Sequence, residues 1–421
     1  MNKIFMRRTT TLASFCVSSL VGLATVCSAA SAAEPDAPMT IDVNGQSLVP
    51  FFNLTKNSQY TFHPYASVGA GYDGNVFLAP NNTVKDTYFQ GIIGAQIDWA
   101  PTQVDHLRAK GGYNRVAYHD YDNEAGLRGG DVKVGYQHEG QVWAGFADAS
   151  WSRTNDPLLD TRERALLDAW TGDGRIDYRT VKTRSSLGAT WARDNYLEST
   201  SSFTETERDN DRIGAYVRWA YEMSESESIY VRTGPGRTLY NEYTKYANST
   251  NWFAVVGTER ALGSITTLKA EGGLTYRHYD DTLPSNPTIT TRSYWAPQAN
   301  LEMRYNYEEQ SWVRATAFSA LQDSASAAYA AYYFGGKIDA RQRLLKNAGA
   351  IASVEVTENY DTDAGTRTRE RTVDRIFQAG LDYQLREGLG IRAIGGYEKS
   401  TAQVAAGFSR WTASAAVNAA F

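Results

Sequence analysis

The chain has 421 residues, with 42 Lys and Arg against 47 Asp and Glu, so its formal net charge is −5. This balance argues against a nucleic-acid partner, which would need a clustered basic surface. Two cysteines and five histidines also leave few residues for a metal centre or a thiol-based active site. The abundance of Tyr, Trp and Gly, with few Pro and Met, is typical of all-β proteins, either soluble or embedded in an outer membrane.

Residues 1–32 have the pattern of a cleaved secretory signal peptide. Three basic residues among the first eight precede a mainly apolar stretch, and small residues then end at Ala32. A membrane-spanning helix is the alternative, but serines interrupt the apolar stretch and a cleavage site follows it. Cys16 and Cys27 both lie in this segment, so we expect the mature chain to contain no thiol and no disulfide.

Residues 33–58 differ in kind from the rest of the chain. They contain Pro35, Pro38 and Pro50 and show no sustained alternation of apolar and polar residues. We expect a periplasmic N-terminal extension, or a segment tucked into the lower mouth of the domain that follows. The segment is too short for the plug domain of a large energised receptor.

From residue 59 to the end, segment after segment alternates apolar and polar residues with a period of two. Over residues 89–99, for example, Phe89, Ile93 and Trp99 share one face, whereas Gln96 and Asp98 lie on the other. These strands run for ten or more residues, about twice the usual length in a soluble sandwich. No run of about 18 apolar residues occurs, so a membrane-spanning helix is not expected after the signal.

The connections between these strands alternate between short and long. Short ones include residues 138–140 and 181–182, and long polar ones include residues 155–168 and 198–211. This alternation is typical of barrels with tight periplasmic turns and long extracellular loops. The sequence therefore predicts an all-β, transmembrane, outer-membrane antiparallel β-barrel over residues 59–421. We expect about 18 strands, with 16 or 20 as alternatives, and both ends of the barrel on the short-turn side.

Aromatic residues fit a membrane setting for this barrel. Tryptophans near expected strand ends predict a girdle at the lipid headgroup level: Trp99, Trp143, Trp170, Trp219 and Trp295. The chain ends in Phe421 on an alternating strand, which we interpret as the signal that the barrel-insertion machinery reads.

The first hairpin of the barrel carries a short motif in which Tyr72 and Asp73 precede Asn75 and Phe77, and Asp86-Thr87 then opens the second strand. This motif resembles the β-barrel porin-2 family, although Gly74 stands where an Asp is often seen. The resemblance implies an outer-membrane barrel with no catalytic residues. It also implies a conduit or an accessory barrel for polymer export, since some members of that family lie in exopolysaccharide operons.

Charged side chains at strand centres, on the face opposite the apolar one, are expected to line the lumen. The basic set that could set selectivity is Arg108, Lys110, Lys133, Arg175, Arg212, Arg218, Lys269, Arg304, Arg314 and Arg392. Many should pair with acidic neighbours across strands. A slight basic excess favours anionic solutes. The opposite register predicts that five other residues face lipid: Ile93, Val134, Trp219, Leu301 and Leu381.

The histidines give weak grounds for catalysis, so we expect no enzyme and no cofactor. His119-Asp120 and His278 with Asp280 lie at extracellular strand ends, where such pairs also arise by chance. A lipase-like site would need a Ser beside a His on the lipid-facing wall, and no His is expected to have one. Acidic loop clusters such as residues 120–122 and 361–363 are interpreted as solvated charge rather than Ca²⁺ sites.

The sequence thus leaves two functions open. The first is a porin-like channel for passive passage of small or anionic solutes, such as a saccharide or an exported exopolysaccharide. The second is a non-conducting structural or accessory barrel that binds partners of a polysaccharide export system. Expected partners are outer-membrane lipid, lipopolysaccharide, the barrel-insertion machinery and polysaccharide export components, and the expected location is the outer membrane of a Gram-negative bacterium.

Overall fold

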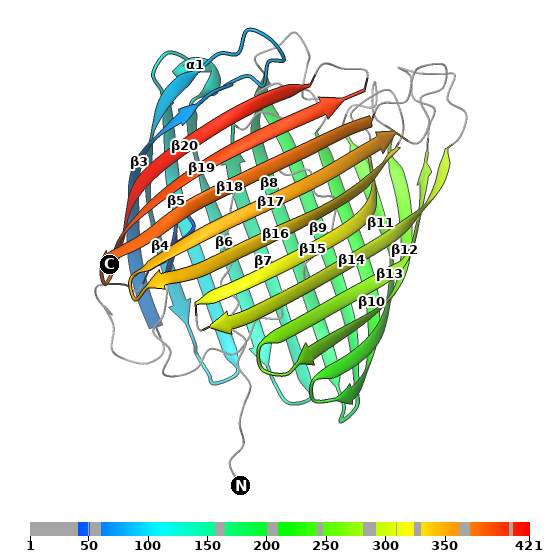
Figure 1. Cartoon of the computed structure of the whole chain (residues 1–421). Coiled ribbons are helices and arrows are strands. Elements are labelled where there is room, and N and C mark those ends of the chain that lie inside the picture. Colours follow the sequence, from blue (N-terminus) through cyan, green and yellow to red (C-terminus); the bar gives the residue numbers. More distant parts are fainter. Residues whose placement is uncertain are drawn as a thin grey trace.

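A single antiparallel sheet closes on itself to form a barrel of 18 strands, β3 to β20, so the predicted fold class and strand number are confirmed (Figure 1). The computed structural model describes residues 41–48, 50, 60–155, 165–199, 209–241, 247–280, 292–308, 310–323, 330–361, 371–403 and 407–421. The expected signal peptide, both cysteines and most of the expected extension lie outside these residues. Within the described part, no helix is long and apolar enough to cross a membrane.

The strands of the barrel follow one another in chain order. Their bounds are β3 Tyr60–Asp73, β4 Asp86–Trp99, β5 Asp105–Tyr118, β6 Leu127–Glu139, β7 Trp143–Thr154, β8 Ala165–Arg179, β9 Thr183–Ser199, β10 Asn210–Ser224, β11 Glu227–Tyr240, β12 Ser249–Leu262, β13 Thr266–Tyr279, β14 Ser293–Glu308, β15 Ser311–Asp323, β16 Ala330–Leu345, β17 Ala348–Asp361, β18 Arg371–Arg386, β19 Leu389–Ala402 and β20 Phe408–Ala420. One short helix, α1 (Asp122–Ala125), lies in the connection between β5 and β6.

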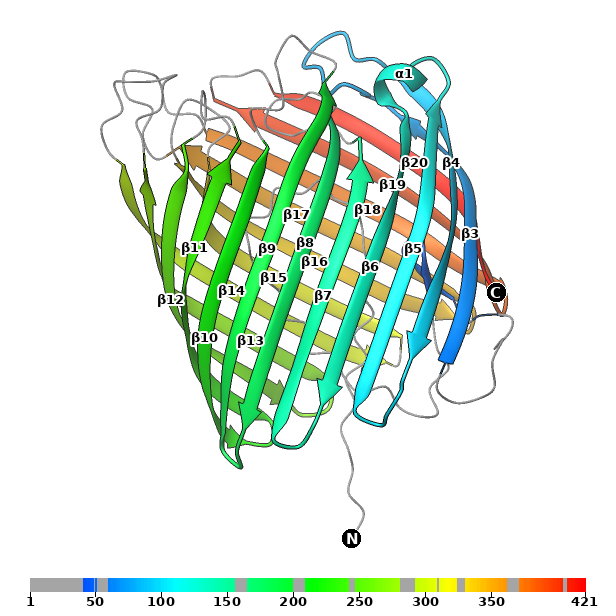
Figure 2. The ribbon, with the colours of Figure 1, turned by 180° about the vertical axis from the view of Figure 1, so that it is seen from behind.

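Short and long connections alternate along the whole barrel, as predicted. Two residues separate β10 from β11 and β18 from β19, whereas residues 74–85 and 119–126 connect strands at the opposite end. Figures 1 and 2 show α1 and residues 74–85 at one end of the tilted strands and the tight turns at the other. Strand β3 begins and β20 ends at the tight-turn end, where Tyr65 pairs with Ala420. This end is therefore the periplasmic one.

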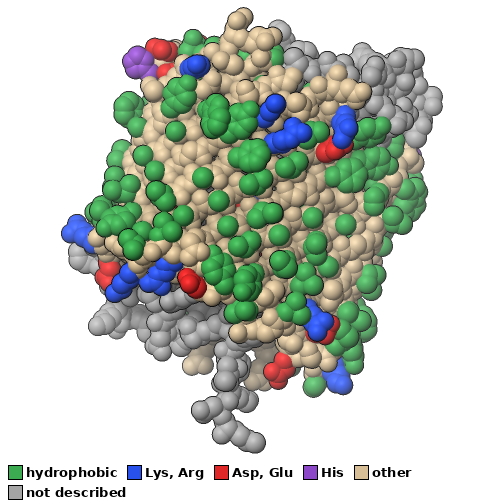
Figure 3. Space-filling model, viewed as in Figure 1, with side chains coloured by type: hydrophobic (Ala, Val, Ile, Leu, Met, Phe, Trp, Pro, Cys, Tyr) green, Lys and Arg blue, Asp and Glu red, His purple; other side chains and the backbone are tan. Residues whose placement is uncertain are grey.

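The outer wall of the barrel is apolar. Phe89 and Ile93 of β4 point outward and are 67% and 66% exposed, whereas Gln90 and Ile92 between them point to the inner face. The five residues predicted to face lipid are all exposed on this wall. Figure 3 shows hydrophobic side chains across the middle of one side of the barrel and charged side chains near its two ends. Because only a closed sheet satisfies every backbone group in lipid, this surface suits a bilayer.

The tryptophan girdle differs in part from the prediction. Trp99, Trp143 and Trp295 point outward within two residues of strand ends, but Trp170 and Trp219 lie five residues from the nearest ends of β8 and β10. The strands extend past the segments that alternate clearly in the sequence, because backbone pairing continues through residues whose side chains no longer need to be apolar. Strand ends were therefore less predictable than strand centres.

Inward-facing aromatic rings fill space over glycines of neighbouring strands. Tyr216 of β10 lies over Gly188 of β9, and Tyr230 of β11 lies over Gly257 of β12. A Cβ atom at either glycine would collide with the ring. These rings pack against the inner wall and reduce the width of the lumen less than rings pointing to the barrel axis would.

Candidate functional site: the lumen and its N-terminal hairpin

A small hairpin lies against the inner wall of the barrel. Strands β1 (Ile41–Val43) and β2 (Gln46–Leu48) pair with each other across a turn at Asn44 and Gly45. Both turn residues have positive φ, of 51° and 75°, the backbone that two-residue hairpin turns of the Asn-Gly type require. This segment belongs to residues 33–58, for which the sequence predicts a periplasmic extension or a segment tucked into the lower mouth of the barrel. Residues 41–48 of that stretch lie inside the barrel.

Apolar side chains fix one face of the hairpin to the wall. Val43 and Leu48 are fully buried and pack with Tyr65 of β3 and Ala420 of β20, with Ile92 of β4 beside them. The hairpin therefore lies across the junction between the first and last strands of the barrel. Sequence reasoning missed this element because only a few residues alternate there, although the Asn44-Gly45 pair was a usable hairpin signal.

Three polar wall residues hold the other groups of the hairpin. Lys110 donates from Nζ to the Asp42 carbonyl oxygen at 2.8 Å, and Arg392 donates to the Asn44 carbonyl oxygen at 3.2 Å. Asn418 donates to Oε1 of Gln46 at 2.9 Å. Two of the basic residues expected to line the lumen thus contact the hairpin.

The Asp42 side chain is only half satisfied at this contact. Its Oδ1 accepts the Gly45 N–H at 2.8 Å, but its Oδ2 is buried without a hydrogen-bond partner in the described part of the chain. Burial raises the pKa of this carboxyl, and nearby Lys110 opposes that effect only in part. The docked hairpin therefore favours the protonated form of Asp42.

The structure places all ten predicted basic residues on the inner face of the barrel, as the strand registers show. Seven of them lie within ion-pair distance of a carboxylate. The pairs are Arg108–Asp98, Arg175–Asp177 (2.9 Å), Arg212–Asp194 (3.0 Å), Arg218–Glu259 (3.2 Å), Lys269–Glu259 (3.5 Å), Arg314–Asp339 (2.9 Å) and Arg392–Asp382 (3.5 Å). Most of the basic lumen wall is therefore neutralised locally.

The remaining three, Lys110, Lys133 and Arg304, have no carboxylate within ion-pair distance in the described part of the chain. Lys110 and Lys133 face each other directly on β5 and β6, and Lys133 is exposed. On β14, Arg304 donates to the Asn306 side chain at 2.9 Å and lies 5.0 Å from the ring centroid of Trp312.

These cations lie on nearly opposite walls of the lumen. Strand β14 is eight strands away from β6 in one direction around the barrel and ten in the other. Arg314, the direct cross-strand neighbour of Arg304, also lies near Trp312, at 5.9 Å from its ring, and is paired with Asp339. The lumen thus presents cationic groups from two sides, with Lys133 and Arg304 free of the hairpin.

Charge on the inner face is also distributed unevenly along the barrel axis. We compare the inward charged residues that lie two or more positions from the centre of their strand. On the side of the long loops, the acidic ones are Asp73, Asp86, Asp131, Asp194, Asp374 and Glu398, and the basic ones are Arg212, Arg277 and Arg410. On the tight-turn side, the basic residues are Arg108, Arg175, Arg179, Arg184, Lys269, Arg304, Arg314, Arg341, Arg343 and Arg392, and the acidic ones are Asp98, Glu139, Asp177, Glu222, Glu259 and Asp382. The extracellular half is thus mainly acidic and the periplasmic half mainly basic.

The motif residues at the first hairpin have structural positions. Asp73 and Asn75 are fully buried, and Asn75 both donates to and accepts from Ala79. Phe77 contacts the Tyr121 ring edge to face at 5.5 Å, whereas Tyr72 points outward and is partly exposed. The motif shapes the extracellular loop after β3 and contributes no group to the middle of the lumen.

Phe421 follows the last residue of β20. Its N–H donates to the Pro64 carbonyl oxygen at 2.8 Å, and its side chain is exposed on the outer wall. The terminal residue therefore lies at the periplasmic end of the junction between the first and last strands.

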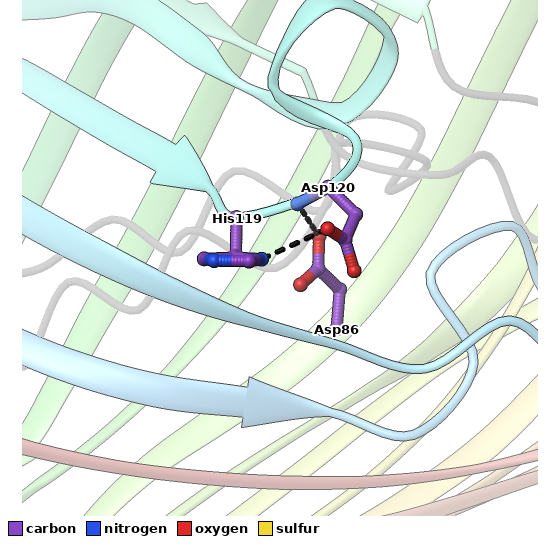
Figure 4. A group of neighbouring side chains, drawn as sticks. All are labelled: Asp86, His119 and Asp120. Carbon is purple, nitrogen blue, oxygen red and sulfur yellow. Dashed lines mark hydrogen bonds and ion pairs between the residues drawn. The ribbon is translucent and has the colours of Figure 1, made fainter.

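The one group of possible metal ligands in the described residues is at the extracellular rim (Figure 4). Asp86 accepts the N–H groups of Thr87 at 2.7 Å and Asp120 at 2.9 Å, and His119 Nδ1 lies 2.8 Å from Asp120 Oδ1. The Asp86 carboxylate is thus engaged with backbone amides and anchors the loop. Asp122, in the expected acidic cluster, pairs with Arg115.

One expectation about histidines was wrong. His278 of β13 and Ser293 of β14 face each other directly, with Nδ1 and Oγ 2.9 Å apart. The Tyr276 hydroxyl also lies 3.1 Å from Ser293 Oγ. The pairing escaped prediction because the long connection between the two strands leaves their register undetermined in the sequence. No carboxylate in the described residues lies within ion-pair distance of His278, so a group that would orient it as a base is lacking there.

The closed sheet, apolar outer wall and charged inner wall define a transmembrane β-barrel of the outer-membrane type. No family model and no curated protein matches the sequence. Among solved structures, the chain is similar to a BenF-like porin from Pseudomonas fluorescens (TM-score 0.49, 11% identity, covering 86% of this chain and 99% of that one). Others are OpdK from Pseudomonas aeruginosa (0.47, 10%, 86% and 99%) and OccAB4 from Acinetobacter baumannii (0.46, 7%, 87% and 100%). The assignment to the class rests on the sheet and its two walls.

Proposed function

We propose that this barrel lies in the outer membrane of a Gram-negative bacterium and is a passive channel for small anionic solutes. The observation that carries the proposal is the pair of inward cations, Lys133 and Arg304, that lack carboxylate partners in the described part of the chain. They belong to strands on nearly opposite sides of the lumen.

A barrel of this strand number is wide enough to leave an aqueous channel instead of a side-chain core. In such a channel, fixed cations on the wall raise the local concentration of anions and lower that of cations. The neutralised pairs elsewhere on the wall add little to this preference, because each cation is matched by a nearby carboxylate. The unpaired cations Lys133 and Arg304 therefore carry the anion preference, whereas the mainly acidic extracellular half opposes it at the entrance.

The resemblance to the β-barrel porin-2 family suggests a saccharide or exported exopolysaccharide as the cargo. An acidic saccharide suits the unpaired cations, and the Trp312 ring beside Arg304 supplies an aromatic surface near one of them. We propose no enzymatic role, since the His278–Ser293 pair lacks an orienting carboxylate among the described residues.

The experiment is single-channel recording from the purified mature barrel in a planar bilayer under a KCl gradient. We expect discrete conductance steps and a reversal potential whose sign shows that chloride permeates more readily than potassium. A conducting barrel that prefers potassium would contradict the anion-channel proposal.

The lumenal hairpin favours a second candidate function, a non-conducting accessory barrel whose partners are components of a polysaccharide export system. Residues 41–48 are fixed to the inner wall by buried apolar contacts and by polar wall residues. If the barrel conducts neither as the whole mature chain nor after removal of these residues, this second function is favoured over the first.

A further inference from the structure

Two cations stand side by side on the lipid-facing wall near its extracellular end. Arg375 of β18 and Lys399 of β19 are direct cross-strand partners. Their chain neighbours Asp374 and Ser400 are buried on the inner face, so Arg375 and Lys399 point outward. Arg375 donates to Thr401 Oγ1 at 3.1 Å. In the described part of the chain, neither cation has a carboxylate within ion-pair distance.

Two adjacent cations on the lipid-facing wall are unfavourable unless an anion binds to them. Like charges directly opposite each other on a sheet destabilise the pairing, and a cation on the lipid face costs free energy that falls toward the membrane interface. Two other outward arginines at this rim have acidic partners: Arg371 pairs with Glu358 at 2.7 Å, and Arg237 pairs with Asp280 at 2.6 Å. The Arg375–Lys399 pair lacks such a partner within the described residues.

The position of the pair along the barrel points to the level of the lipid headgroups. Arg375 lies four residues from the loop end of β18, and three aromatic residues lie next to the pair on the membrane side. The ring centroids of Phe377 and Tyr397 are 6.4 Å apart, and those of Tyr397 and Trp411 are 4.4 Å apart. Aromatic rings gather at the interface between acyl chains and headgroups. Figure 3 shows Lys and Arg side chains at this end of the face, above the hydrophobic band.

Below the aromatic rings the outer wall is smooth. The next outward residues on β18, β19 and β20 are Ala379, Gly395 and Ala413, which are neighbours across the strands. A methyl group added at Gly395 would have its nearest neighbouring atom 3.9 Å away, so the surface is open there. Acyl chains can lie against such a surface without meeting large side chains.

We propose that Arg375 and Lys399 form a binding site for the phosphate of a phosphorylated glycolipid of the outer leaflet, that is, lipopolysaccharide. The two cations hold the phosphate, and the acyl chains pass the aromatic rings onto the smooth surface. Thr401 positions Arg375 by accepting its hydrogen bond, while the Thr401 hydroxyl itself donates to the Val373 carbonyl oxygen at 3.2 Å. The phosphate supplies the anion that the protein lacks at this point. The proposal requires only that the barrel span an outer membrane and does not depend on conduction through the lumen.

The test measures binding of purified lipopolysaccharide to the detergent-solubilised mature barrel, before and after enzymatic removal of the lipid A phosphates. We expect the variant Arg375→Gln/Lys399→Gln to bind intact lipopolysaccharide about tenfold or more weakly, because two charged contacts are lost. The matched control, Arg128→Gln/Arg193→Gln, removes two outward cations from β6 and β9 and should bind as the wild type does. Dephosphorylated lipopolysaccharide should bind the wild type as weakly as intact lipopolysaccharide binds the first variant.

Each remaining outcome contradicts the proposal. Unchanged binding by the Arg375→Gln/Lys399→Gln variant would remove these residues from any lipid site, and an equal loss in the control would show a diffuse effect of surface charge. Binding of phosphatidylglycerol vesicles as strongly as lipopolysaccharide would indicate attraction to any anionic lipid. Heat-dependent migration on gels confirms that each variant is a closed barrel before its binding is measured.

Discussion

Arg410 of the last strand and Asp73 of the first strand form two hydrogen bonds across the line where the barrel closes. Nε of Arg410 donates to Oδ1 at 2.9 Å and Nη2 donates to Oδ2 at 2.7 Å, although the residues are 337 positions apart. Tyr118 adds a hydroxyl at 3.2 Å from Oδ2, and the carboxylate is fully buried. The two ends of the sheet are thus joined by a paired charge at the extracellular side and by the hairpin contacts at the periplasmic side.

The variant Arg410→Ala should destabilise the barrel by about 3–5 kcal/mol, because it leaves the buried Asp73 carboxylate without its cation. The measurement is unfolding by denaturant in detergent, followed by tryptophan fluorescence and gel migration. The control Arg237→Ala breaks a partly exposed pair with Asp280 and should cost about 1 kcal/mol or less. Equal effects of the two substitutions would contradict a special role for the Arg410–Asp73 pair.

In the lumen, the variant Lys133→Glu/Arg304→Glu should shift the reversal potential under a KCl gradient toward cation preference. The two changes replace unpaired cations by anions on nearly opposite walls. The control Lys182→Glu makes the same kind of charge change in a periplasmic turn and should leave the selectivity close to that of the wild type. A conducting channel whose selectivity does not respond to the double change would place its constriction elsewhere.

Deleting residues 41–48 should increase the single-channel conductance, because the hairpin occupies space against the inner wall. The variant Val43→Asp/Leu48→Asp keeps the chain length but places charges in the buried apolar contact, so it should undock the hairpin and raise the conductance similarly. Conductance in both variants that equals that of the wild type would show that the hairpin does not limit flow.

The docking of the hairpin should depend on pH through Asp42. Its pKa is raised in the docked state, so docking takes up a proton. Docking is therefore weakest above the raised pKa, strengthens as the pH falls through it, and gains nothing further below the ordinary aspartate value of 3.8. Lys110, Arg392 and Asp382 face Asp42 and modulate the effect.

We expect the wild-type conductance to decrease over that acidic window. The variant Asp42→Asn mimics the protonated side chain and should show the docked, lower conductance at every pH. The variant that lacks the hairpin should show neither response. A wild-type conductance that rises on acidification would reverse the sign and contradict this account of Asp42.

On the wall of the barrel, Leu301→Arg should impair assembly, because arginine on the lipid face costs about 2–4 kcal/mol near the membrane centre. Asn300→Arg at the preceding residue is the matched control, since Asn300 points to the lumen and Leu301 points to lipid. The amount of heat-modifiable barrel in the outer membrane measures both. Normal assembly of Leu301→Arg would contradict the register of β14.

The strand count and the two faces were predictable because the period of two is carried by many residues in each strand. A one-residue slip in β14 would move Arg304 to the lipid face and Leu301 to the lumen. The sequence therefore determines which residues of the strand face lipid and which face the lumen. Strand ends were less predictable, as Trp170 and Trp219 show, because the residues near the rims meet neither lipid nor a packed core.

The contacts within the lumen were less accessible from the sequence. Arg175 and Asp177 pair within one strand. Arg218 of β10 instead pairs with Glu259 of β12, across the intervening strand β11. Such contacts depend on inter-strand register, which loop lengths do not fix. The same reason hid the His278–Ser293 pair, and the shortness of the hairpin hid the contacts of Asp42.

The uneven distribution of charge along the inner wall has a consequence for the direction of flow. An acidic extracellular half followed by a basic periplasmic half is the arrangement of a bipolar diode, in which one sign of voltage drives mobile ions into the junction between the halves and the other depletes them. A barrel inserted from one side of a bilayer should therefore rectify, carrying larger currents at one polarity than at the other. Because high salt screens the fixed charges, the current–voltage curve should become symmetric as the ionic strength rises.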